Sequence, residues 1–159
     1  MYRHILLPTD GSALSREAVA SAVLFAENIS ARITGIHVMS PSHQEHLDAW
    51  LHQDDRFPQR RKELFERMAL DYLSFIANSA LAEGVPCECK SVSADEPHAA
   101  ILAEARNSRC DLIFMASHGW ADAAHDRIGG ETVKVLGHST VPVLVYRSDS
   151  QASHTAQRV

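Results

Sequence analysis

The chain contains little cysteine and few aromatic residues, and none of its hydrophobic runs is long enough to cross a membrane. Its three cysteines are an odd number, which argues against a disulfide framework and for a reducing cytoplasm. Cys87 and Cys89 do not by themselves predict a zinc site, because such a site needs two further ligands at workable spacing. The apolar run at the amino terminus stops at Pro8, so no secretory signal is expected. These features predict a cytoplasmic protein.

An excess of positive charge is also lacking. Fifteen Lys and Arg stand against twenty Asp and Glu, a formal net charge of -5 with the histidines neutral. Duplex DNA and anionic membranes both favour a basic face, so neither is expected as a partner. A small anionic ligand remains compatible, because backbone N–H groups alone can hold one. The 159 residues suffice for one compact domain that folds without a metal or a disulfide.

Segments of strand character alternate with segments of helical character. Ser12 is a suitable N-cap for one helix, and Pro97 suits the first helical position of another. The alternation predicts an open, doubly wound, five-stranded parallel sheet with helices on both faces. Strands are expected over 4–8, 32–38, 87–92, 111–116 and 141–146, and helices over 13–28, 59–83, from 97, and over 130–136. The domain is expected to span 1–147, followed by a polar, disordered tail over 148–159.

The candidate ligand site lies at two turns of this sheet. Sheets of this kind bind ligands beyond the carboxyl ends of the strands, where the winding reverses, which points to residues 8–12 and 116–130. Four of the seven glycines fall there: Gly11, Gly119, Gly129 and Gly130. Glycine beside a helix start lets N–H groups approach a phosphate, and Asp10 could accept hydrogen bonds from ribose hydroxyls. The alternative, that these glycines only permit tight turns, stays open.

Several motifs, in order and with suitable spacing, resemble the universal stress protein family over residues 1–147. They are Ile-Leu-Leu-Pro-Thr-Asp-Gly-Ser at 5–12, Gly-Ile-His-Val at 35–38, the stretch 110–119 and the stretch 140–147. ATP-binding members of that family have G-x2-G-x9-G followed by Ser or Thr, and the same register here is Ala116-x2-Gly119-x9-Gly129-Gly130. Ala116 thus replaces the first glycine and Gly130 replaces the hydroxyl residue, whose contact Thr132 is a candidate to supply. The resemblance implies the fold of the adenine nucleotide alpha hydrolases.

The resemblance also implies an adenine-nucleotide site. Asp10 would meet the ribose, and the backbone around Val38 would contact the adenine edge. The residues expected at the nucleotide are Pro8, Thr9, Asp10, Val38, Met115, Ala116, His118, Gly119, Gly129, Gly130, Glu131 and Thr132. The ligand is expected to be ATP, ADP or AMP, with Mg²⁺ as a candidate companion. Between ATP and AMP the sequence leaves the choice open, because Asp122 and Asp126 bring negative charge that only Arg127 and His125 offset.

A homodimer through the last strand is implied as well. Its interface residues are expected to be Val141, Val143, Leu144, Val145 and Tyr146. A β-branched strand at a sheet edge suits this role, because an unpaired edge invites a partner. The implied function is that of a regulatory binding protein in stress response, in which bound nucleotide orders residues 120–128, and no catalytic residue is expected. Slow ATP hydrolysis, and action through protein association alone, remain alternatives.

Other chemistries fit the sequence less well. Ser117 and His118 could serve as nucleophile and base, but neighbours at a strand end are expected to point apart and no acid is placed to orient the histidine. A response-regulator site needs a pair of acids after the first strand, where Asp10 stands alone. Flavin binding would rest on fold alone.

A metal site in the polar segment before the long helix is the last alternative. It would use His43, His46, Asp48 and His52, but spacing this loose is common in polar loops, so no metal is expected. Trp50 and Trp120 each fall in a polar stretch, where they could be lid, interface or local anchor residues.

Overall fold

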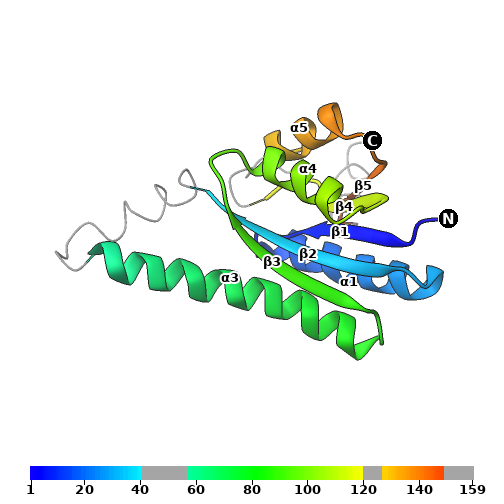
Figure 1. The fold of residues 1–159 in the computed structure, drawn as a ribbon, viewed down its shortest axis with the longest axis horizontal. Coiled ribbons are helices and arrows are strands. Elements are labelled where there is room, and N and C mark those ends of the chain that lie inside the picture. Colours follow the sequence, from blue (N-terminus) through cyan, green and yellow to red (C-terminus); the bar gives the residue numbers. More distant parts are fainter. Residues whose placement is uncertain (41–56, 120–126, 149–159) are drawn as a thin grey trace, which may run out of the picture.

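The computed structural model describes residues 1–40, 57–119 and 127–148, and these form one five-stranded parallel sheet (Figure 1). The strand order is β3-β2-β1-β4-β5, and every neighbouring pair runs parallel. The strands are β1 (His4–Pro8), β2 (Arg32–Met39), β3 (Cys87–Ser93), β4 (Leu112–Ala116) and β5 (Val143–Tyr146). The predicted doubly wound sheet is confirmed, and its winding reverses between β1 and β4.

Within the described residues, helices cover both faces of the sheet (Figure 1). α1 (Ala13–Ile29) and α3 (Phe57–Ala82) pack on one face, and α4 (Pro97–Asn107) and α5 (Gly130–His138) on the other. Successive residues of a strand point to opposite faces, so Leu7 joins Ile76 of α3 while Leu6 joins Val135 of α5. All four side chains are fully buried.

Local signals in the sequence set the starts of two helices. Ser12 caps α1, since its side chain accepts the N–H of Ser15. Pro97 stands at the start of α4, where its missing N–H leaves no hydrogen bond unmade. Both starts agree with the prediction, and both lie at the end of the sheet where the candidate site was expected.

The start of the last strand differs from the prediction. β5 begins at Val143, so the expectation that Val141 belongs to this strand is wrong. Pro142 has no N–H to give to a sheet ladder, although its carbonyl still accepts the N–H of Ile113 at 3.0 Å. Val141 nevertheless packs beside the core under α4 and α5, so its apolar character is explained without a strand.

β5 and β3 form the two edges of the sheet, as expected for the last strand. Among the helices described, none is both long enough and apolar enough to cross a membrane. Of the tail for which disorder was predicted, only Ser148 lies within the described residues.

Candidate functional site

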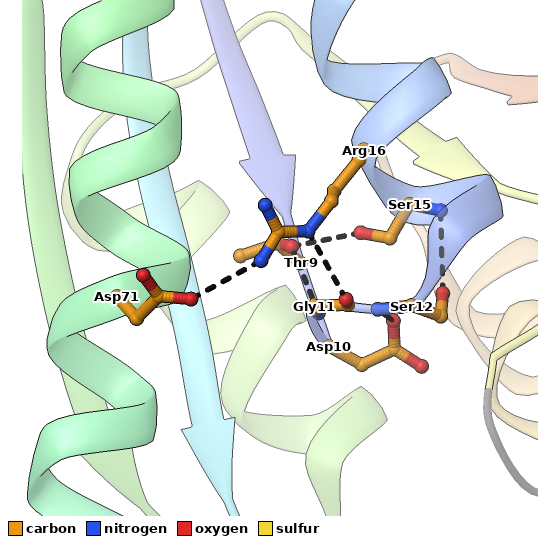
Figure 2. A network of polar contacts seen from close by, with 7 residues as sticks. All are labelled: Thr9, Asp10, Gly11, Ser12, Ser15, Arg16 and Asp71. Atoms are coloured by element: carbon orange, nitrogen blue, oxygen red, sulfur yellow. Dashed lines mark hydrogen bonds and ion pairs between the residues drawn. The ribbon is translucent and has the colours of Figure 1, made fainter.

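The turn after β1 is built from hydrogen bonds among its own polar side chains (Figure 2). Thr9 Oγ1 lies 2.8 Å from Ser15 Oγ and accepts the Gly11 N–H at 3.2 Å. The Ser12 N–H donates to Asp10 Oδ1 at 3.0 Å, which closes a turn of the kind that Asp favours. One oxygen of the Asp10 carboxylate is therefore anchored by the backbone at the carboxyl end of β1.

The same turn is covered by α3. Gly11 has φ +76°, and a Cβ atom on it would lie 2.1 Å from the Tyr72 ring. His37 of β2 meets that ring edge-on, with centroids 5.2 Å apart, and its Nδ1 lies 2.8 Å from the Thr9 carbonyl oxygen. Burial, and next the Asp10 carboxylate, raise the pKa of Tyr72 above its ordinary value. The turn is thus held between β2 and a long helix distant in sequence.

Arg16 links α1 to α3 beside this turn (Figure 2). Its Nη2 lies 3.1 Å from Asp71 Oδ2, its Nε donates to the Gly11 carbonyl at 3.5 Å, and its Cζ lies 4.9 Å from the Phe75 ring centroid. The paired side chains are 41% and 69% exposed, so we expect the ion pair to stabilise the fold by less than about 1 kcal/mol. Arg16 thus contacts the Gly11 carbonyl of the turn and two side chains of α3.

The end of β4 and the start of α5 form the opposite side of the site. The Gly129 N–H donates to the Ser117 carbonyl at 2.7 Å, and the Thr132 hydroxyl donates to the Ala116 carbonyl at 3.1 Å. These bonds hold the amino terminus of α5, where the helix dipole is positive, against the end of β4. Because the Thr132 proton is directed to Ala116, this hydroxyl can offer a ligand only its lone pairs.

The two sides approach each other at Asp10 and Gly119. A Cβ atom on Gly119 would lie 2.1 Å from Asp10 Oδ2, so only glycine leaves room for the carboxylate. Gly130, by contrast, has nothing within 4 Å of such an atom. A close contact therefore requires glycine at position 119, whereas no such contact requires it at position 130.

Both sides line one pocket at the carboxyl end of the sheet. Its wall contains eleven of the twelve residues that were expected at a nucleotide: Pro8, Thr9, Asp10, Val38, Met115, Ala116, His118, Gly119, Gly129, Glu131 and Thr132. The exception is Gly130, which is exposed at the start of α5. The structure thus brings together residues from β1, β2, β4 and α5.

Four further lining residues were missed by the sequence analysis: Ser15, Ile36, Pro97 and Ile101. Ile36 stands two positions before Val38 in β2, and the period of two puts both on one face. Pro97 and Ile101 are four residues apart on α4, which places them on one side of that helix. The periodicity of these elements was therefore a usable signal for three of the four.

Glu131 carries most of the polar contacts on the α5 side. Its Oε2 accepts the His98 backbone N–H at 2.8 Å and lies 3.2 Å from His98 Nδ1, while its Oε1 lies 2.8 Å from Lys134 Nζ. Burial alone would raise the pKa of Glu131, but hydrogen bonds from Lys134 and from the His98 amide bring it below its ordinary value. Glu131 is therefore ionised at neutral pH.

The expectation that Ser117 and His118 point apart is wrong. Ser117 Oγ lies 3.2 Å from His118 Nδ1, because the chain leaves the extended conformation directly after β4. Ser117 is buried and His118 lines the pocket. The contact joins the two side chains but does not by itself supply an acid to orient the ring.

Several residues singled out in the sequence lie outside the described residues. They are the candidate metal ligands His43, His46, Asp48 and His52, together with Trp50, Trp120, Asp122, His125 and Asp126. Within the described ranges, no three His, Cys, Asp or Glu side chains come close enough to hold a metal ion.

Comparison with known sequences finds one family. The universal stress protein family model matches residues 1–147. A relative from Thermus aquaticus, the "Universal stress protein in QAH/OAS sulfhydrylase 3'region", is 28% identical over 147 residues, which are 92% of this chain and all of the relative.

Solved structures share the fold. The hypothetical protein MJ0577 superposes with a TM-score of 0.72 at 23% identity, over 94% of this chain and 98% of its own. A universal stress protein in complex with cAMP superposes with a TM-score of 0.63 at 21% identity, over 92% of this chain and 97% of its own. The universal stress protein from Archaeoglobus fulgidus in complex with dAMP superposes with a TM-score of 0.64 at 16% identity, over 91% of this chain and 97% of its own. At these identities the likeness establishes the architecture of the sheet and its helices.

Proposed function

Because the chain belongs to the universal stress protein family, we propose that it binds an adenine nucleotide between β1 and β4 and acts in stress response as a dimeric regulatory protein. One observation carries the proposal: the Asp10 carboxylate and the amino terminus of α5 face one pocket. Ribose hydroxyls can donate to the first, and a phosphate group suits the second. Apolar side chains of the same lining, Val38, Ile101 and Met115, suit the faces of an adenine ring.

Two of the structural neighbours support the choice of ligand. They contain cAMP and dAMP, and both molecules combine an adenine, a sugar and one phosphate. The proposed ligands for this chain are AMP, ADP and ATP. Mg²⁺ stays a candidate companion to which we assign no protein ligand, because Mg²⁺ beside a nucleotide is held largely by phosphates and waters.

Nucleotide uptake tests the proposal directly. We expect equilibrium dialysis with labelled AMP and ATP to show saturable uptake of at least one of them. We expect Asp10→Asn to weaken it by roughly 10- to 100-fold, because hydrogen bonds to a charged group contribute about 1.5–3 kcal/mol. Glu83→Gln is the control, since it removes one negative charge from an exposed side chain outside the pocket and should leave uptake unchanged. Absence of uptake by the wild-type protein at millimolar nucleotide would disprove the proposal.

Slow ATP hydrolysis is the second candidate function. The contact between Ser117 Oγ and His118 Nδ1 at the pocket favours it, because a hydroxyl and an imidazole in contact can share a proton. Phosphate release from ATP by the wild-type protein distinguishes the two functions: a regulatory binding protein retains its nucleotide intact.

The proposed dimer would form through the outer edge of β5. On the inner side, the Pro142 and Tyr146 carbonyls accept N–H groups of Ile113 and Ser117 in and after β4. Backbone groups alternate along a strand, so those of Val143 and Val145 point to the outer edge. There they could pair with a second copy of β5 across a two-fold axis. We further propose that this dimer resides in the cytoplasm.

A proline substitution tests this edge. We expect Val145→Pro to give a monomer by light scattering at micromolar concentration, because it removes an outward N–H while leaving the inner ladder intact. Val145→Thr keeps the N–H and the β-branched shape, so it should remain dimeric. A dimer that persists in Val145→Pro would place the interface elsewhere.

A further inference from the structure

α4 begins without a side-chain cap of its own. Its N-cap residue Glu96 makes no capping hydrogen bond, and the first N–H after Pro97 belongs to His98. That N–H donates at 2.8 Å to Oε2 of Glu131, which lies 33 positions later in the chain. The carboxylate of Glu131 thus occupies the anion position at the amino terminus of α4.

Glu131 also stands in the first turn of α5. The positive ends of two helices, α4 and α5, therefore meet at one ionised side chain, and that side chain lines the pocket. Without a carboxylate between them, these two helix ends would attract the phosphates of a ligand. Here a protein carboxylate already satisfies one of them.

The described lining of the pocket contains no cationic lysine or arginine. Among the described lining residues the charged side chains are Asp10 and Glu131. Lys134 lies outside the lining, with its ammonium 2.8 Å from Glu131 Oε1. Arg127 is exposed and also outside the lining.

We propose that Glu131 acts as an internal anion that makes this pocket prefer adenosine and its monophosphate over ATP. The inference rests on the proposed nucleotide site and names the class of ligand that it accepts. Each added phosphate increases repulsion from Glu131 and Asp10 in a partly buried setting, where water screens charge less than it does at an open surface. The preference is therefore graded: adenosine and AMP bind, ADP binds less tightly, and ATP least.

Calorimetric titration of adenosine, AMP and ATP into the purified full-length protein, first in EDTA and then in Mg²⁺, tests this order. In Glu131→Gln the amide oxygen can still accept the His98 N–H, while one negative charge is lost and Lys134 is released. We expect ATP to bind this variant at least tenfold more tightly than wild type, with adenosine affinity within twofold. Lys134→Gln should act in the opposite direction and weaken ATP, because it leaves Glu131 without its cation. Glu83→Gln carries the same charge change at the other end of the sheet, after α3, and should alter neither ligand.

The outcomes separate the two proposals. Suppose that wild type binds adenosine or AMP, that it binds ATP equally tightly, and that Glu131→Gln does not bind ATP more tightly. This result would support the nucleotide site but overturn the proposed role of Glu131. A loss of ATP affinity in Glu131→Gln that is confined to Mg²⁺ would make Glu131 a metal ligand and also overturn it. If none of the three ligands binds wild type or either variant of the Glu131–Lys134 pair, the site itself is wrong and the inference falls with it. Thermal melting of each variant shows whether it is folded. If Glu131→Gln does not fold, Lys134→Gln still decides the test, because Lys134 is exposed and its substitution should leave the fold intact.

Discussion

Replacing Gly11 with alanine is expected to lower the free energy of unfolding by about 3 kcal/mol, because two costs add at this position. Its φ of +76° lies in the left-handed region, which costs an L-residue roughly 1–2 kcal/mol. The new Cβ would also lie 2.1 Å from the Tyr72 ring, and overpacking of this kind costs roughly 1–3 kcal/mol. In a chain of this size, about 3 kcal/mol corresponds to a fall in Tm of roughly 6–12 °C, measurable by circular dichroism.

A second substitution separates the two costs. Tyr72→Ala removes the ring that the Cβ would strike but leaves the backbone of Gly11 unchanged. We expect the double variant Gly11→Ala/Tyr72→Ala to be more stable than the sum of the single changes predicts, by about 1 kcal/mol or more. Strict additivity would mean that the ring moves away at no cost. A Tm of Gly11→Ala within about 2 °C of wild type would mean that the turn is not held as described.

The fold could be predicted from the sequence because its signals are local. Apolar strand segments alternate with helical ones, and Ser12 and Pro97 mark two helix starts that the structure confirms. The prediction was wrong at Val141, where β-branched residues extend the apparent strand through Pro142. There the missing N–H of proline outweighs β propensity, which depends on context more than on the backbone itself.

The position of the pocket was predictable for a different reason. In a doubly wound sheet, topology alone brings the ends of β1 and β4 together, so Asp10 and Gly119 had to be near each other. Their closeness, with no room for a side chain between them, had no sequence signal beyond the glycine itself.

Contacts between distant segments could not be predicted. Tyr72 covers Gly11 from 61 positions away, and Glu131 caps a helix that begins 34 positions earlier. Neither follows from periodicity, because each depends on how two helices are set on the sheet. Glu131 contributes charge to the pocket lining, so the sequence predicted where a ligand would bind more readily than which ligand.

Gly119→Ala is expected to weaken adenosine binding by roughly tenfold or more while leaving the fold largely intact. The new methyl group would lie 2.1 Å from Asp10 Oδ2, so the carboxylate must turn away from it. The other oxygen is bonded to the Ser12 N–H, so Asp10 cannot turn without giving up the bond that orients it. The ribose would then lose a charged acceptor, whose hydrogen bond contributes about 1.5–3 kcal/mol. Unlike Gly11, Gly119 does not have a positive φ, so the backbone itself tolerates alanine.

Gly130→Ala provides the matched control for this prediction. Nothing lies within 4 Å of a Cβ atom at Gly130, and alanine is favoured over glycine within a helix by up to about 1 kcal/mol. We therefore expect this variant to match or slightly exceed wild type in Tm and to bind adenosine within twofold of it. Adenosine is the appropriate ligand for both titrations, because it carries no phosphate and is insensitive to the charge of Glu131. If both alanine variants bind adenosine equally well, the ribose does not depend on Asp10. A loss confined to Gly119→Ala, with its Tm retained, instead supports Asp10 as the group that receives the sugar.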